Sequence, residues 1–151
     1  MLSDMDRRIV NLLQADGRKT NAEIAIEVGL STSAAHRRVQ QLRDSGVISG
    51  YRAIVDPRKA GLSVIGYVSV KMESHDESLL REFVRGVEGI DEIVACHAIS
   101  GGGDYLLKVV AADMDAFAGV TLKRLVRLPG VKDSTTNFVL STVKQEQTWP
   151  V

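Results

Sequence analysis

Apolar residues recur along residues 1–50 at the spacing of amphipathic helices. Capping boxes at Ser3–Asp6 and Thr20–Glu23 mark two helix starts. Asp16-Gly17 and Gly29 mark two helix ends. The pattern predicts three helices, over residues 3–16, 20–28 and 31–44. Because a tight glycine-containing turn separates the second helix from the third, we predict a helix-turn-helix unit.

The pattern changes after residue 60, where β-branched apolar runs alternate with helical ones. It predicts strands over residues 64–72, 92–99, 104–111 and 134–143, and helices over residues 78–87 and 114–128. The two helix exits, Val87-Glu88-Gly89-Ile90 and Leu128-Pro129-Gly130-Val131, match in register and indicate an internal repeat. Two β-α-β units in series predict the ferredoxin-like βαββαβ arrangement. The expected fold class is therefore α+β, with an N-terminal (winged) helix-turn-helix domain before a ferredoxin-like domain.

These patterns divide the chain into a helix-turn-helix domain (1–50), a strand-like linker (51–61) and a ferredoxin-like domain (62–151). In the last of these, apolar residues such as Ile65 and Tyr67 fall on the strand face opposite the expected core. An antiparallel sheet with one solvated face would alternate more cleanly. We therefore expect sheet-to-sheet assembly of several copies to cover the second face.

The composition is that of an ordinary soluble protein, with 151 residues, 44% apolar and 25% charged. Its one cysteine, Cys96, excludes an intrachain disulfide and favours a reducing cytoplasm. No apolar run approaches the roughly 20 residues that a membrane span needs. The first ten residues lack the basic-then-apolar pattern of a secretory signal. We expect a cytoplasmic protein.

The net charge is zero, but its distribution along the chain is uneven. Residues 1–60 carry ten Lys or Arg against seven Asp or Glu, and residues 61–151 carry nine against twelve. This small asymmetry suggests that the helical half meets a polyanion.

The third predicted helix has a polar face opposite its apolar side of Ala35, Val39 and Leu42. Arginine and glutamine on such a face can read guanine and adenine, although a solvated polar face is also common on helices. The candidate DNA-binding residues are Thr32, Ser33, His36, Arg37, Arg38, Gln40 and Gln41. Arg38 lies nearer the apolar side, so we expect it to contact phosphate and to pack its stem.

Three successive glycines, Gly101 to Gly103, precede Asp104 between two predicted strands. A strand turn needs at most one or two residues with positive φ, so the triplet suggests a ligand close to bare backbone. Successive N–H groups can form a nest for a carboxylate, and Asp104 can take an ammonium group. The alternative is a permissive hairpin turn in which Asp104 only stabilises the turn.

Nothing in the sequence resembles a catalytic or metal-binding constellation. The histidines, His36, His75 and His97, lie in different predicted elements, and no HExxH or Ser/His/Asp pattern occurs. We expect no cofactor and no metal ligation, and we interpret His97 as an interior histidine and Trp149 as a packing residue.

Several motifs, in their order and spacing, resemble one protein family over essentially the whole chain. They are Leu2-Ser3-Asp4-Met5-Asp6-Arg7, Asn21-Ala22-Glu23-Ile24-Ala25, Val28-Gly29-Leu30-Ser31, Arg37-Arg38-Val39, Leu42, Gly46-Val47-Ile48, Gly50-Tyr51, Asp104-Tyr105-Leu106-Leu107 and Leu128-Pro129-Gly130-Val131. The family is that of the Lrp/AsnC (feast/famine) transcription regulators.

The resemblance implies a regulator that binds double-stranded DNA through its first domain and a small effector, often an amino acid, through its second. It also implies homodimers that commonly build into tetramers or octamers, with effectors held between dimers. The effector-binding residues that it implies are Gly101, Gly102, Gly103, Asp104, Tyr105, Ser134 and Thr136. Family members often carry a bulky or charged residue where this chain has Gly102-Gly103, so we expect a neutral amino acid.

Two other functions remain open from the sequence. Some tetrapyrrole (siroheme-type) decarboxylases share this two-domain architecture, and they would use cationic and histidine side chains around an anionic macrocycle. Only His97 and Lys108 lie near the expected cleft. The second is an effector-sensing scaffold without operator specificity, which sequence-dependent DNA binding would distinguish.

Overall fold

The computed structural model describes residues 2–145 and 148–151, and its contacts divide the chain into two compact units. Unit 1 comprises Met1–Ile54 together with Val143–Val151, and unit 2 comprises Val55–Thr142. The structure thus groups residues 143–151 with unit 1, whereas the sequence pattern assigned them to the second domain.

Unit 1 is built from three short helices, α1 (Asp4–Ala15), α2 (Asn21–Val28) and α3 (Thr32–Asp44). Each helix begins at a hydroxyl side chain, which accepts a hydrogen bond from the backbone N–H three residues further on. These three caps are Ser3, Thr20 and Ser31. The apolar stripes of the helices meet in one core, formed by Ile9, Val10, Leu13, Ile24, Ala25, Val28, Ala35, Val39 and Leu42.

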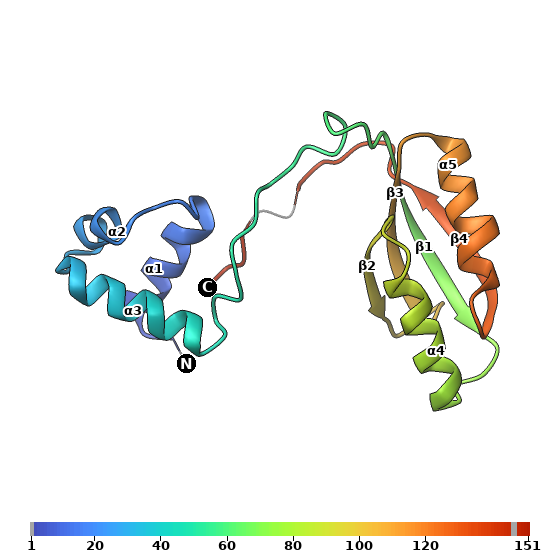
Figure 1. Ribbon diagram of the computed structural model, residues 1–151, viewed down its shortest axis with the longest axis horizontal. Helices are drawn as coiled ribbons and strands as arrows, with labels where there is room; N and C mark the ends of the chain where they lie inside the picture. The colour runs from blue at the N-terminus through green and yellow to red at the C-terminus, as the bar shows by residue number, and fades with distance from the viewer. Residues whose placement is uncertain (1, 146–147) are drawn as a thin grey trace. The chain divides into compact units, whose positions relative to one another are not determined.

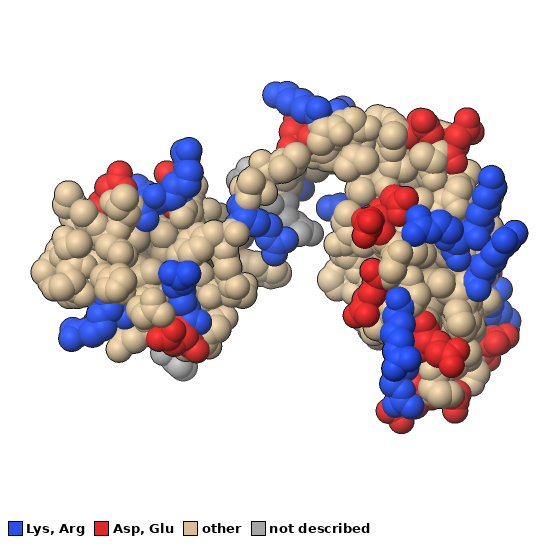
Figure 2. All heavy atoms as spheres, in the orientation of Figure 1, with Lys and Arg blue, Asp and Glu red and all other residues tan. Residues whose placement is uncertain are grey.

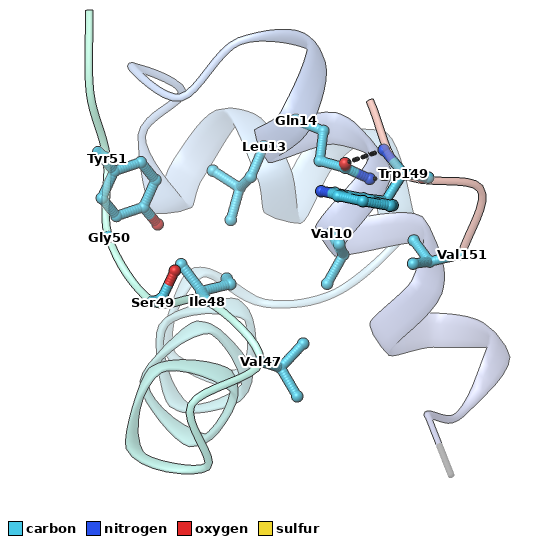
Figure 3. Close-up of a pocket in the computed structure, with 10 residues that line it drawn as sticks. All are labelled: Val10, Leu13, Gln14, Val47, Ile48, Ser49, Gly50, Tyr51, Trp149 and Val151. Atoms are coloured by element: carbon cyan, nitrogen blue, oxygen red, sulfur yellow. Dashed lines mark hydrogen bonds between the residues drawn. The ribbon is translucent and has the colours of Figure 1, made fainter. Parts of the chain in front are cut away.

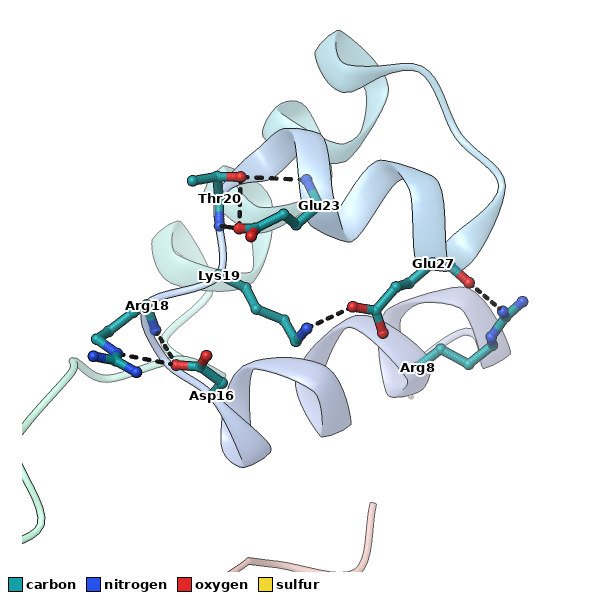
Figure 4. Close-up of polar contacts among 7 residues, drawn as sticks. All are labelled: Arg8, Asp16, Arg18, Lys19, Thr20, Glu23 and Glu27. Carbon is teal, nitrogen blue, oxygen red and sulfur yellow. Dashed lines mark hydrogen bonds and ion pairs between the residues drawn. The ribbon is translucent and has the colours of Figure 1, made fainter.

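Polar contacts fix α2 against α1 and the turn between them (Figure 4). The backbone N–H of Thr20 donates to Glu23 at 2.7 Å, which completes the predicted capping box. At the other end of α2, Lys19 Nζ lies 2.5 Å from Glu27 Oε1, and Arg8 donates to the Glu27 carbonyl oxygen at 2.9 Å. Exposed pairs of this kind contribute little to stability because solvent screens them, so the apolar core remains its main source.

The connector that follows α3 contains no strand between residues 45 and 63. Its first part belongs to unit 1, because Ile48 packs against the helical core. Tyr51 lies beneath the guanidinium group of Arg43, with 5.7 Å between Cζ and the ring centroid.

Unit 2 contains a four-stranded antiparallel sheet in the order β2-β3-β1-β4 (Figure 1). The strands are β1 (Val64–Met72), β2 (Ile93–Ala98), β3 (Tyr105–Ala111) and β4 (Val131–Phe138). Helix α4 (Glu77–Glu88) follows β1, and α5 (Met114–Ala118) follows β3. The order along the chain is the predicted βαββαβ.

Both helices of unit 2 cover the same face of the sheet. The buried positions Val68 and Val70 of β1 and Leu107 of β3 belong to one cluster with Phe83 of α4 and Phe117 of α5. Directly paired residues of antiparallel strands share a face. The strand register therefore assigns Ile65, Tyr67, Ser69, Leu106, Lys108 and Val110 to the opposite face, which no helix of unit 2 covers.

Two elements of unit 2 differ from the predicted ones. The last strand ends at Phe138 rather than at residue 143, and the helix predicted over 114–128 is α-helical only in its first part. It continues as a π-helical segment (Gly119–Arg124) and a 3-10 turn (Leu125–Arg127). In the described part of the chain, no helix is long and apolar enough to cross a membrane.

Candidate nucleic-acid interface and effector site

Helix α3 turns most of the candidate DNA-binding side chains outward. The exposed candidates are Thr32, Ser33, His36, Arg37, Gln40 and Gln41. Ala35, Val39 and Leu42 of the same helix are buried in the core of unit 1. The core therefore fixes which face of α3 is presented, since rotating the helix would bury charged groups.

Arg38 has a different position from the other candidates, because it is half-buried and paired within unit 1. Its Nη1 lies 2.8 Å from Oδ1 of Asp6 on α1. The Ser3 hydroxyl and then the Arg38 guanidinium lower the pKa of the Asp6 carboxyl. Arg38 thus links α3 to α1 in this structure.

Arg37 is the exposed cation on the outer face of α3. Among the described residues it makes no hydrogen bond or ion pair with another side chain. Most other basic side chains of unit 1 already have a partner, namely Arg8, Arg18, Lys19, Arg38 and Arg43. The guanidinium of Arg37 is therefore available to an external acceptor.

The neighbours of Arg37 are partly preorganised by local contacts. Nδ2 of Asn21, at the start of α2, lies 3.0 Å from Nδ1 of His36, which leaves Nε2 of a neutral ring as the N–H donor. Gln40 donates to Asp44 at 2.7 Å, one helical turn further on. That contact occupies one amide N–H of Gln40 and leaves its carbonyl oxygen and second N–H for other partners.

A polar cleft of about 250 Å³ opens within unit 1 beside this face. Its lining includes Lys19, Asn21, His36, Gln40 and Arg43. Such a set of N–H donors suits phosphate oxygens, which carry no sequence information but fix the register of a protein on DNA.

Charge is not concentrated on the visible surface. Figure 2 shows basic and acidic side chains interspersed on the face in view of each unit, without a continuous basic stripe. This agrees with the small positive excess of the first sixty residues. So small an excess indicates that DNA contact would depend on a few placed side chains rather than on a large field.

The glycine triplet consists of three positions with different requirements. Gly101 has φ +126°, a conformation that residues with a side chain rarely adopt. A Cβ at Gly103 would overlap the Ser69 hydroxyl and lie 3.2 Å from the carbonyl oxygen of Val70. A Cβ at Gly102 would meet no atom within 4 Å. Two of the three glycines are therefore required by the hairpin itself, and only Gly102 is not.

Asp104 connects this loop to the end of β1. Its carboxylate accepts a hydrogen bond from the backbone N–H of Met72 at 2.7 Å and lies 2.8 Å from Nε2 of His75. Its own backbone N–H donates to the carbonyl oxygen of Val70 at 2.8 Å. The Met72 N–H, followed by His75, lowers the pKa of the Asp104 carboxyl. Both carboxylate oxygens are thus engaged within the chain.

The remaining effector candidates lie on the helix side of the sheet. Tyr105 packs against Phe83 of α4, with ring centroids 4.7 Å apart. Ser134 pairs with Val70 and Thr136 with Val68 across β1 and β4, and both are partly buried. Because Val70 also pairs with Tyr105 on β3, the glycine loop and Ser134 flank the same end of β1.

Other side chains singled out from the sequence are placed as follows. His97 is exposed, so its interpretation as an interior histidine is wrong. Lys108 lies 6.0 Å from the ring centroid of Tyr67 on the uncovered sheet face. Cys96 packs against the helix-side core, and burial raises the pKa of its thiol. Within residues 2–145 and 148–151, no three His, Cys, Asp or Glu side chains are grouped as metal ligands.

Sequence reasoning missed the partners that hold the site together. In the sequence His75 stands alone in its predicted element, and nothing there distinguishes Ser69. Both are brought to the loop by the sheet register, and no local pattern signals either contact. The contact between Asn21, at the start of α2, and His36 of α3 joins residues 15 positions apart, and no local pattern signals it either.

Both units of the chain are similar to domains of known proteins. The family model for the Lrp/AsnC ligand-binding domain matches residues 65–149, and that for a winged helix-turn-helix DNA-binding domain matches residues 2–49. The chain is 38% identical over 144 residues to the leucine-responsive regulatory protein of Escherichia coli strain K12. That match covers 95% of this chain and 88% of the relative, and the Salmonella typhimurium protein gives the same figures.

Solved structures with the same two-domain fold include two complexes with L-methionine. A transcriptional regulator of Neisseria meningitidis bound to L-methionine has a TM-score of 0.94 at 33% identity, covering 99% of this chain and 97% of that one. The feast or famine regulatory protein of Mycobacterium tuberculosis complexed with L-methionine has a TM-score of 0.90 at 30% identity, covering 99% of each chain. The decarboxylase alternative finds no support in these similarities.

Proposed function

This chain belongs to the Lrp/AsnC family of transcriptional regulators, and we propose that it reads DNA through the outer face of α3 under the control of a neutral amino acid. The observation that carries the DNA-binding part is Arg37, an exposed guanidinium without a partner in the described chain on the helix after the turn. A guanidinium can donate two parallel hydrogen bonds to O6 and N7 of guanine.

The side chains around Arg37 have complementary roles in this proposal. Ser33, His36 and Gln40 lie on the same exposed face and can reach base edges or the sugar-phosphate backbone. Thr32 and Gln41 lie at its margins. Arg38, which pairs with Asp6, supports the orientation of α3.

We propose further that the uncovered sheet face of unit 2 forms the contact between two copies. Ile65, Tyr67 and Leu106 are only half-buried there, and Val110 lies among them. An apolar sheet face of this kind is stable when a second sheet packs on it. Two-fold pairing would present two α3 helices to half-sites about one DNA turn, or multiples of it, apart.

The effector is proposed to bind at the glycine loop, at an interface between subunits. Gly101 and Gly102 are exposed, and the loop and Ser134 flank one end of β1. The loop carries no charged side chain apart from Asp104, whose carboxylate is already engaged. A neutral amino acid therefore fits better than lysine or glutamate, and the L-methionine complexes of two relatives support this choice.

In this proposal the protein is a transcriptional regulator that acts in the cytoplasm, and it is not an enzyme. The support is its membership of a family of transcriptional regulators.

Two measurements test the proposal separately. Selection of duplexes from a random pool, at one fixed salt concentration, should enrich a sequence with two related half-sites. If the recovered duplexes share no common sequence, the protein does not recognise a specific operator.

In a thermal-shift screen of the amino acids, neutral members such as L-methionine should raise the melting temperature of the protein. A ligand at 100 times its dissociation constant adds about 2.7 kcal/mol to folded stability. If no amino acid changes the melting temperature, the glycine loop is a hairpin turn without a role in effector binding.

A further inference from the structure

The segment Thr148–Val151 lies along α1, far from its place in the sequence. The amide side chain of Gln14 makes two hydrogen bonds with the backbone of Trp149 (Figure 3). Its Oε1 accepts from the Trp149 N–H at 2.6 Å, and its Nε2 donates to the Trp149 carbonyl oxygen at 3.0 Å. One amide thus satisfies both polar groups of a residue that is 135 positions away.

A second amide, almost one helical turn earlier, continues this contact. Asn11 Nδ2 donates to the carbonyl oxygen of Val151 at 3.3 Å, and Asn11 Oδ1 accepts from Gln14 Nε2 at 3.3 Å. Residues three apart on a helix are separated by roughly 4.5 Å along its axis, and alternate residues of an extended chain by roughly 6.6 Å. The segment therefore runs antiparallel to α1, with every second residue held by an amide.

The same segment closes one side of an apolar cavity within unit 1. The cavity has a volume of about 380 Å³, and Val10 and Leu13 of α1 contribute to its lining. Figure 3 shows Trp149 and Val151 on one side of it and Tyr51 on the other. The 148–151 segment and the start of the connector thus share one site on α1.

The docking is shallow, and this suggests that it is reversible. Trp149 was expected to be a packing residue, yet it is 79% exposed. The hydrogen bonds that hold the segment are also exposed to solvent. The free energy gained from a few exposed hydrogen bonds is comparable to the free-energy cost of the conformational entropy that a short segment loses when it is ordered.

We propose that Thr148–Val151 is a reversible latch that docks on Asn11 and Gln14 of its own chain. Two stretches of chain join the two units, one before β1 and one after β4. When the latch is docked, the stretch after β4 is anchored to α1 as a second tether. When it is released, only the connector holds the helical unit.

The consequence for DNA rests on the function proposed above. A helical unit on one tether samples a larger volume, which lowers its effective concentration at the second of two half-sites. The docked latch should therefore favour simultaneous binding of two half-sites and leave the binding of a single half-site unchanged.

Docking can be measured without DNA or effector, because Trp149 is the single tryptophan of the chain. In the full chain, the fluorescence anisotropy of Trp149 should be clearly higher than that of a synthetic peptide ending in Thr148–Val151. The double variant Asn11→Ala with Gln14→Leu should lower it toward the peptide value, with the helical circular dichroism retained. Arg18→Ala, also exposed in unit 1 but away from the segment, should leave it unchanged. Equal anisotropy in the wild type and the double variant would overturn the latch.

A mixed assembly decides whether the segment docks on its own chain. Chains that end at residue 147 are mixed with full chains carrying Gln14→Leu, so that only the shortened chains offer an intact α1 site. Trp149 should remain free in the mixture. Recovery of high anisotropy would mean docking between subunits and would overturn the assignment to the same chain.

The last experiment tests the consequence for DNA. Removal of residues 148–151 should weaken binding to a duplex with two half-sites severalfold and leave binding to one half-site unchanged. Equal loss on both duplexes would overturn the tether role. Absence of binding by the full chain would instead count against the proposed DNA-binding function, while the anisotropy result stood.

Discussion

The carboxylate of Asp104 accepts a hydrogen bond from the backbone N–H of Met72 at 2.7 Å, so the hairpin between β2 and β3 is fastened to the end of β1. The same carboxylate lies 2.8 Å from Nε2 of His75, just beyond that strand. An acid in a glycine-rich loop thus has a structural task before any ligand is considered. In the proposed effector site, Asp104 would therefore hold the loop backbone in place.

Replacing Asp104 by Asn should make the stability of the protein less dependent on pH in the acid range. The Met72 N–H and His75 lower the pKa of this carboxyl in the folded chain. Its stabilising effect is therefore fully present above the unfolded value of about 4 and is lost as the pH falls through the lower folded value. Melting temperatures between pH 7 and pH 3 should show Asp104→Asn below wild type at neutral pH and converging with it in acid.

Asp91→Asn, at an exposed turn, is the control for the loss of one carboxylate. A melting-temperature difference between Asp104→Asn and wild type that stays constant from pH 7 to pH 3 would contradict the linkage.

Alanine substitutions of the three loop glycines should differ in their effect on stability. Gly102→Ala should be close to neutral, because its Cβ meets no atom within 4 Å. Gly101→Ala should destabilise by about 1 kcal/mol or more, since its φ of +126° is unfavourable for alanine. Urea denaturation of the three variants measures the order.

Gly103→Ala should also destabilise, but for a steric reason that can be partly relieved. Its Cβ would overlap the hydroxyl of Ser69. Adding Ser69→Ala to Gly103→Ala should therefore recover part of the lost stability, whereas adding it to Gly101→Ala should not. A Ser69→Ala effect that is the same in both backgrounds would refute the steric explanation.

The two neighbouring arginines of α3 should separate DNA reading from folding. Arg37→Ala should weaken specific binding by roughly 1–3 kcal/mol, as for a lost bidentate base contact, without changing the melting temperature. Arg38→Ala removes a half-buried ion pair with Asp6 and should lower stability by up to about 1 kcal/mol. DNA titration at matched salt and thermal unfolding measure the two effects. If Arg37→Ala lowers the melting temperature and leaves specific DNA binding unchanged, Arg37 is not the base-reading residue.

A charge on the uncovered sheet face should break the proposed assembly. Ile65 is half-buried in one chain and pairs with Val110 on that face, so Ile65→Glu would desolvate a carboxylate if a second sheet packed there. Size-exclusion chromatography with light scattering should show smaller particles for this variant. Ile26→Glu, an equal exchange at a position that is 81% exposed in unit 1, should keep the wild-type size. If the wild type, Ile65→Glu and Ile26→Glu all have the same particle size, the contact between copies does not lie on this sheet face.

Much of this architecture depends on interactions between residues that are close in the sequence, so it could be predicted from the sequence. The caps Ser3, Thr20 and Ser31 mark helix starts because a hydroxyl satisfies backbone N–H groups of its own first turn. The polar face of α3 follows from the helical period once Ala35, Val39 and Leu42 are assigned to the core. The repeat of two β-α-β units was visible in the two matching helix exits.

What depended on residues far apart in the chain could only be decided by the folded structure. Strict alternation along β2 would place Ile93 and Cys96 on opposite faces, but a bulge between Ile93 and Ala95 lets both pack against the helix-side core. The separate roles of Gly101 and Gly103, and the engagement of Asp104, arise where β1 meets the hairpin.

The position of Trp149 on Gln14 has the same origin. The sequence determined the elements, because caps and periodicity act within a few residues. The tertiary structure decided which backbone groups, carboxylates and amides meet, because the register of paired strands and the return of a distant segment bring together residues that no local pattern relates.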